Sequence, residues 1–158
     1  MIFDSRNEFA DAVSVVAAAG TALIGNVIDL GSGHRDMGQG KTLYLVITSD
    51  TEIITAGVAG TIKFQLVTDA QAAIAVDGTA TVHFDTGTFV TGSAAANDPK
   101  LNAGSVIICA ALPMEGKIYE RFLGVLAVTA TTATTAGKIN AFLTYDPTGW
   151  QTYAEGIN

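Results

Sequence analysis

The feature that most constrains the fold is a series of short apolar runs between residues 23 and 145, each closed by Gly, Pro, Asn or Asp. Short strands separated by regular turn signals are typical of a β-sandwich, whereas βαβ units would place a helical pattern between them. The runs lie at residues 23–30, 42–48, 61–68, 80–84, 89–91, 105–112, 120–129 and 138–145. We therefore predict an all-β domain, a jelly-roll β-sandwich of about eight strands.

The runs differ in how their apolar residues are spaced. Apolar and polar side chains alternate over residues 62–66, which predicts that Phe64 lies on a buried face and that Lys63 and Gln65 lie on a solvent-exposed face. The runs at 43–47 and 122–128 are almost continuously apolar. Such strands are covered on both faces, so we expect them to be central strands or strands at a subunit contact.

Length and composition favour one self-sufficient domain. A chain of 158 residues buries roughly two thirds of its unfolded surface and needs no disulfide or structural metal to fold. The formal charge is −7, and the eight Lys and Arg residues are scattered, which argues against nucleic acid as a ligand. A protein partner or a neutral sugar is the expected ligand class.

No segment of the sequence reads as a membrane span or a secretion signal. The longest weakly polar stretch, residues 12–24, is shorter than the roughly 20 residues that cross a bilayer. Asp4, Glu8 and Asp11 stand where a signal peptide would carry positive charge. The single cysteine, Cys109, lies in an apolar run, so we expect a buried, inert thiol and synthesis in a reducing cytoplasm.

The two ends of the chain differ from the middle. Residues 1–20 are predicted to form an extended N-terminal arm that opens with a capping-box pattern at 5–8 and reaches a neighbour, and residues 21–158 a single sandwich domain with a short C-terminal tail. The alternative for the arm is a terminus lying on its own domain. The apolar and aromatic side chains of both ends are the candidate contacts to a second copy or a partner: Ile2, Phe3, Phe9, Trp150 and Tyr153.

One glycine-rich segment partly matches the sequence motif of a phosphate-binding loop. Residues 38–42 read Gly-Gln-Gly-Lys-Thr, as at the end of a P-loop. The first glycine of that motif falls at Arg35, and a strand rather than a helix is expected at 42–48. The segment is therefore predicted to be a turn that leads into a strand, without a nucleotide.

The titratable residues form no recognisable catalytic or metal-binding set. His34 and His83 are each followed two residues later by an aspartate, Asp36 and Asp85, but nothing supplies the three or four ligands that zinc requires. We expect these four residues to be solvated surface groups. No metal and no cofactor is predicted.

Catalytic arrangements are equally weak. No serine lies in a Gly-x-Ser-x-Gly elbow, and an apolar setting disfavours the Cys109 thiolate. A glycosidase pair among Glu115, Glu120 and Asp146 is a background possibility that sequence spacing does not test. The alternating charges of residues 117–121 are more simply the protection of a sheet edge. We predict that the protein is not an enzyme.

Five short segments, taken together, point to a family: residues 26–31 (Asn-Val-Ile-Asp-Leu-Gly), 35–38 (Arg-Asp-Met-Gly), 43–46 (Leu-Tyr-Leu-Val), 120–123 (Glu-Arg-Phe-Leu) and 136–143 (Ala-Gly-Lys-Ile-Asn-Ala-Phe-Leu). In these segments the chain resembles the jelly-roll cement, or decoration, proteins of tailed bacteriophage capsids. This resemblance implies a small sandwich that binds the outside of the major capsid shell, forms homo-oligomers and locks neighbouring capsomers against internal DNA pressure. It implies no catalytic residues.

We accordingly expect a structural protein on the outer surface of a virion, made in the host cytoplasm. Its partners would be the major capsid protein and itself, as a trimer or a dimer, with no nucleic acid and no membrane. The alternative is a carbohydrate-binding jelly-roll module, such as the receptor-recognition head of a phage fibre. That alternative needs exposed aromatic rings for sugar stacking, and the candidates are Trp150, Tyr153, Tyr119 and Tyr145.

Overall fold

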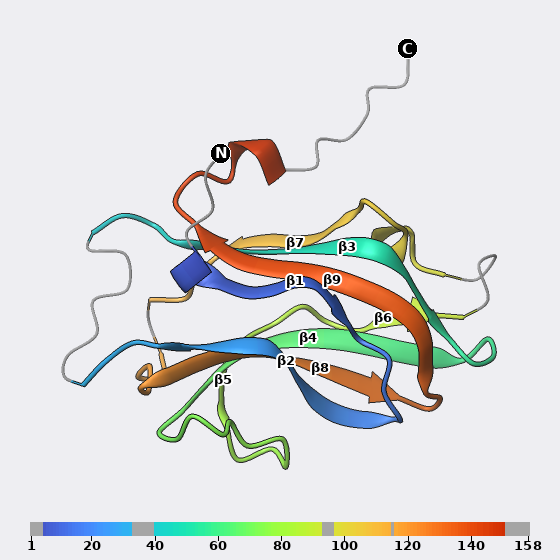
Figure 1. Cartoon of the computed structure of the whole chain (residues 1–158), viewed down its shortest axis with the longest axis horizontal. Helices are drawn as coiled ribbons and strands as arrows, with labels where there is room; N and C mark the ends of the chain where they lie inside the picture. The colour runs from blue at the N-terminus through green and yellow to red at the C-terminus, as the bar shows by residue number, and fades with distance from the viewer. Residues whose placement is uncertain (1–4, 33–39, 93–96, 115, 151–158) are drawn as a thin grey trace.

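The computed structural model describes residues 5–32, 40–92, 97–114 and 116–150, and in this part of the chain two antiparallel sheets pack face to face (Figure 1). The strands are β1 (Glu8–Ser14), β2 (Gly20–Asp29), β3 (Tyr44–Thr55), β4 (Gly60–Asp69), β5 (Thr81–Asp85), β6 (Phe89–Thr91), β7 (Val106–Ala111), β8 (Phe122–Ala130) and β9 (Thr134–Thr144). Three short 3-10 turns accompany them: η1 (Ser5–Asn7), η2 (Pro99–Leu101) and η3 (Thr148–Trp150). The prediction of an all-β sandwich is confirmed.

The strand pairing is nested along the chain. Sheet A has the order β1-β9-β3-β7, and sheet B has the order β2-β8-β4-β5, with the short β6 also paired to β4. The first strand therefore pairs with the last, the second with the next to last, and so on inwards to β4 and β5. Nested pairs of this kind support the jelly-roll connectivity, which stays a prediction.

The two almost continuously apolar runs form central strands, as expected. β3 lies between β9 and β7, and β8 lies between β2 and β4. The inner faces of both sheets supply the main core, in which Phe64 of β4 is 0% exposed. Lys63 and Gln65, its neighbours along the strand, are only partly buried, so the alternation predicted at residues 62–66 is confirmed.

The predicted N-terminal arm is wrong for the part of it that forms β1. Glu8–Ser14 pairs along β9 as the outer strand of sheet A (Figure 1), and Phe9 is 0% exposed in the main core. Two register shifts interrupt this pairing, and Ala12 has a positive φ of 49°. Bulges break the two-residue alternation by which a strand is read from sequence, so this strand looked like an irregular tail.

A smaller core lies on the outer face of sheet B, under the connection between β4 and β5. Ile74 of this connection packs with Val67 and Leu126 of the sheet. A Cβ on Gly124 of β8 would lie 2.5 Å from the Ile74 Cδ1, so the absence of a side chain there admits the connection. This cover explains why β8 is apolar on both faces.

Candidate functional site

The connection between β7 and β8, residues 112–121, is tied to sheet B by a stacked pair of rings. The rings of His83 and Tyr119 are 3.9 Å apart between centroids and nearly parallel, at 4°. The Tyr119 hydroxyl donates to the Pro113 carbonyl at 2.9 Å, and partial burial raises the pKa of Tyr119 to about 12. His83 is therefore a packed residue, and the prediction of a solvated surface histidine is wrong.

The same histidine is hydrogen-bonded to a threonine of β4. The His83 Nε2 and the Thr68 Oγ1 are 2.7 Å apart, which is a distance typical of a base and the nucleophile it activates. Thr68, however, is 0% exposed, and its Oγ1 already accepts from the Glu120 backbone N–H at 3.1 Å. A buried hydroxyl with two partners is not open to a substrate, so we interpret the pair as structural.

Charges around His83 come from the connection itself. Partial burial lowers the pKa of His83, Lys117 lowers it further, and Glu120 acts in the opposite direction. The Glu120 Oε1 accepts from the Thr81 hydroxyl of β5 at 2.7 Å. The neutral imidazole is thus the form that this network stabilises.

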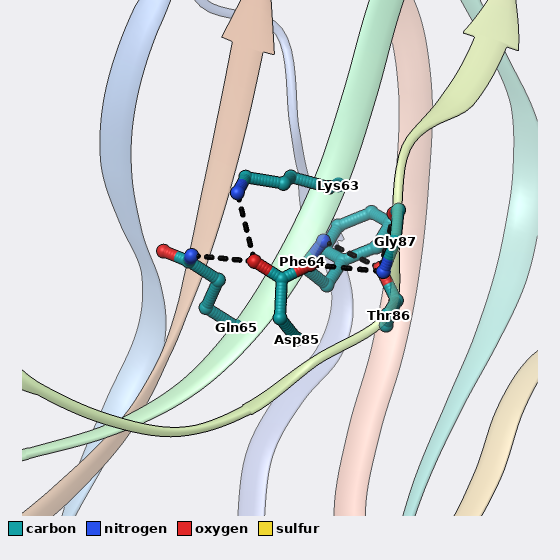
Figure 2. Close-up of polar contacts among 6 residues, drawn as sticks. All are labelled: Lys63, Phe64, Gln65, Asp85, Thr86 and Gly87. Atoms are coloured by element: carbon teal, nitrogen blue, oxygen red, sulfur yellow. Dashed lines mark hydrogen bonds and ion pairs between the residues drawn. The ribbon is translucent and has the colours of Figure 1, made fainter.

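Asp85 joins β5 to β4 through a second polar network, which Figure 2 shows. Its carboxylate accepts from the Lys63 Nζ and the Gln65 Nε2 at 2.7 Å each, and from the Gly87 backbone N–H at 2.9 Å. Burial acts to raise the pKa of Asp85, but these donors outweigh it and the pKa lies below its usual value. Asp85 is held by these donors, but it stays exposed at the end of β5, as predicted.

The prediction that the charged residues at 117–121 protect a sheet edge is wrong. They precede β8, which is a central strand. The Arg121 Nε and Nη2 donate to the two Asp29 carboxylate oxygens at 2.8 Å each, which fixes the end of the connection to β2. Between these anchors, Met114 is 59% exposed and Ile118 is 87% exposed. We call Met114, Lys117 and Ile118 the loop tip.

A pocket of about 400 Å³ opens on the outer face of sheet A. Its lining comes from β1, β3, β9 and η3: Glu8, Ala10, Asp11, Thr48, Asp50, Asn140, Phe142 and Trp150. Asn140 is positioned by the Ala12 N–H, which donates to its Oδ1 at 2.6 Å. The pocket, called the sheet A pocket below, combines three carboxylates with an apolar and aromatic wall.

The candidate contact residues have different positions. Phe9 lies in the core and is not available to a partner in the folded chain. Trp150 folds back onto sheet A, where its ring meets Phe142 edge to face with centroids 5.2 Å apart. Ile2, Phe3 and Tyr153 lie outside the described residues, so their role as contacts stays a prediction.

The candidates for sugar stacking are mostly covered. One face of Tyr119 is occupied by His83, and Trp150 packs against Phe142. Tyr145, which follows β9, is 53% exposed. Of the three described candidates, only Tyr145 is mainly exposed to solvent.

Of the three acids considered for a glycosidase pair, the two described ones, Glu120 and Asp146, bond to different partners. Glu120 bonds to β5, whereas the Asp146 carboxylate accepts from the Thr148 backbone N–H at the start of η3. Glu115, like His34 and Asp36, lies outside the described residues. The end of the glycine-rich segment, residues 40–43, leads into β3 without a helix, as predicted.

The described residues contain neither a cluster of metal ligands nor a membrane-spanning helix, and their one cysteine is a free thiol. Within them, no three or more His, Cys, Asp and Glu side chains cluster in a way that would hold a metal ion. No helix in the same ranges has the length and apolar character needed to span a bilayer. Cys109 is a free thiol that is half-buried rather than buried, and burial raises its pKa.

Sequence reasoning missed the network around His83. Its members Thr68, Thr81 and Glu120 lie on different strands and connections, and no local pattern links residues that far apart. The sequence signal for this network was limited to the aromatic and charged residues at 117–121.

Comparison with known proteins gives one family. The family model described as Bbp16 matches residues 9–143, which covers all nine strands of the described structure except the first residue of β1 and the last of β9. No curated protein matches the chain.

Proposed function

The chain belongs to the Bbp16 family, whose name points to a bacteriophage protein, and from this premise we propose that it is a capsid cement protein. It binds the outer surface of a phage head and stabilises contacts between neighbouring copies of the major capsid protein. The observation that carries the proposal is the family match over residues 9–143, together with the resemblance of several segments to cement proteins.

The architecture supports a mechanical role. A cement protein has to transmit force between its contacts without yielding, and a two-layer sandwich with a continuous core is stiff because its interior is close-packed. The connections are tied down as well: the β7–β8 connection by Tyr119 and Arg121, and the β5–β6 turn by Asp85. The polar networks around His83 and Asp85 contribute to this bracing.

We place the protein on the outside of the virion after synthesis in the host cytoplasm, as a homo-oligomer, with a trimer ahead of a dimer. Symmetric self-association is the common arrangement for small structural proteins. The partners proposed are the major capsid protein and a second copy of the chain, with neither nucleic acid nor a membrane. The role is structural and involves no catalysis and no cofactor.

We favour this role over a carbohydrate-binding module because of the state of the aromatic rings. Sugar stacking needs open ring faces, and of the three described candidates one face of Tyr119 is covered by His83 and the Trp150 ring packs against Phe142, which leaves Tyr145 as the mainly exposed ring. A glycan array separates the two: binding to a glycan without binding to heads would favour the carbohydrate module.

The direct test is co-sedimentation with phage heads assembled without this protein. The purified chain should pellet with the heads at a saturating ratio and should raise the temperature at which the heads release their DNA. The same heads with an unrelated acidic β-sandwich protein are the control. A chain that stays in the supernatant while the heads pellet would overturn the proposal.

A further inference from the structure

We propose that the loop tip of one copy inserts into the sheet A pocket of a second copy. The proposal deepens the oligomerisation part of the proposed function, and it rests on that part. Both halves of the contact are present on the same molecule: an exposed apolar projection and a pocket of about 400 Å³, which is large enough to admit an isoleucine side chain.

The loop tip carries two exposed apolar side chains next to anchored residues. Ile118 is the most exposed of the large apolar side chains among the described residues, at 87%, and Met114 is 59% exposed. The chain is anchored at both sides of the tip, by the Tyr119 hydroxyl on the Pro113 carbonyl and by Arg121 on Asp29. Because Ile118 adjoins the anchored Tyr119, it loses little conformational entropy when it binds.

Charge complementarity selects a second copy as the occupant. Lys117 of the loop tip forms no ion pair with any described residue. The sheet A pocket presents the carboxylates of Glu8, Asp11 and Asp50. An ammonium beside an apolar side chain therefore matches carboxylates beside the aromatic wall of Phe142 and Trp150.

The two surfaces lie on different elements, which fixes the kind of assembly. The tip belongs to the β7–β8 connection, whereas the pocket lies on the outer face formed by β1, β3 and β9. A contact between unlike surfaces is heterologous, and it closes into a ring when the rotation between copies allows it. Such a ring is consistent with the trimer proposed above.

The test uses charge reversal in the full chain, with mass measured by light scattering after size exclusion. Lys117→Glu and Asp50→Lys should each weaken self-association by about tenfold or more, as should Ile118→Asp. The double variant K117E/D50K restores opposite charges at every contact and should recover the mass of the parent. Val58→Asp is the matched control, because Val58 is also highly exposed, at 69%, but lies in the β3–β4 turn.

Each outcome decides the matter, given a parent-like melting temperature for the variants. Single variants that keep the mass of the parent, a double variant that stays dissociated, or a monomeric parent would each overturn the inference. The proposed function is tested separately, by co-sedimentation of the chain with phage heads. A parent that forms rings but does not bind heads defeats the cement role and leaves this contact standing.

Discussion

Replacing Phe9 with alanine tests whether the N-terminal segment is part of the fold or an arm. Phe9 is 0% exposed within the main core, and β1 pairs along β9. Truncating a fully buried phenylalanine removes its transfer free energy and leaves a cavity, which costs about 3–5 kcal/mol. For a domain of this size each kcal/mol lowers Tm by about 2–4 °C, so we expect a fall of about 6–20 °C.

The measurement is urea unfolding followed by circular dichroism, which gives both the free energy of unfolding and its dependence on denaturant. Phe64→Ala serves as an internal standard, because Phe64 is equally buried in β4 and should cost a similar amount. Val16→Ala, just beyond β1 and 53% exposed, should change stability by about 0.5 kcal/mol or less. A Phe9→Ala loss below about 1 kcal/mol, with the denaturant slope of the parent, would refute the placement of β1 in the sandwich.

Three further outcomes follow from the geometry. Gly25→Ala should cost about 2 kcal/mol or more in urea unfolding, since φ is +63° and a Cβ would collide with the Phe9 carbonyl oxygen. The pKa of His83 is lowered in the folded chain, so on acidification the unfolded chain takes up this proton first. The contribution of His83 to stability is therefore complete above pH 6.5 and falls as the pH drops from there to the folded pKa. His83→Gln should flatten this part of the stability profile, and an unchanged profile would argue against the partly buried neutral ring. Asp85→Asn should lower the free energy of unfolding by about 1 kcal/mol or less, because the carboxylate accepts three hydrogen bonds but is partly exposed. An unchanged Tm would show that water replaces the carboxylate equally well as the partner of Lys63 and Gln65.

The strands that sequence reasoning found are those whose pattern is local. β4 alternates cleanly, and β8 reads as a central strand because every position of its middle is apolar. β1 was missed because its bulges, with Ala12 at positive φ, destroy the two-residue period that identifies a strand. Its partner β9 lies at the other end of the chain, and no local signal announces that pairing.

The candidate site was harder to predict, for a related reason. The side chains of His83 and Asp85 look like surface groups in sequence, and they become structural only when Thr68 and Lys63 are brought beside them by strand pairing. The argument from composition is of another kind, because the acidic balance that argues against nucleic acid depends on no contact; the absence of a nucleic-acid partner stays a prediction. The exposure of Met114 and Ile118 in the loop tip is a property of the folded connection, which a one-dimensional pattern does not contain.

The nested pairing of the sheets has a consequence for how the chain acquires its structure. β9 lies between β1 and β3, and Glu8 of β1 pairs with Phe142 of β9, so sheet A has no continuous hydrogen-bonded path until the last strand has been synthesised. Contacts this distant in sequence close slowly, and folding on the millisecond to second scale is typical of such topologies. A nascent chain that ends before residue 134 leaves β1 and β3 with open edges, which are sites for pairing with other chains. Translation rate and chaperone access, rather than the stability of the finished sandwich, would then set the yield of soluble protein.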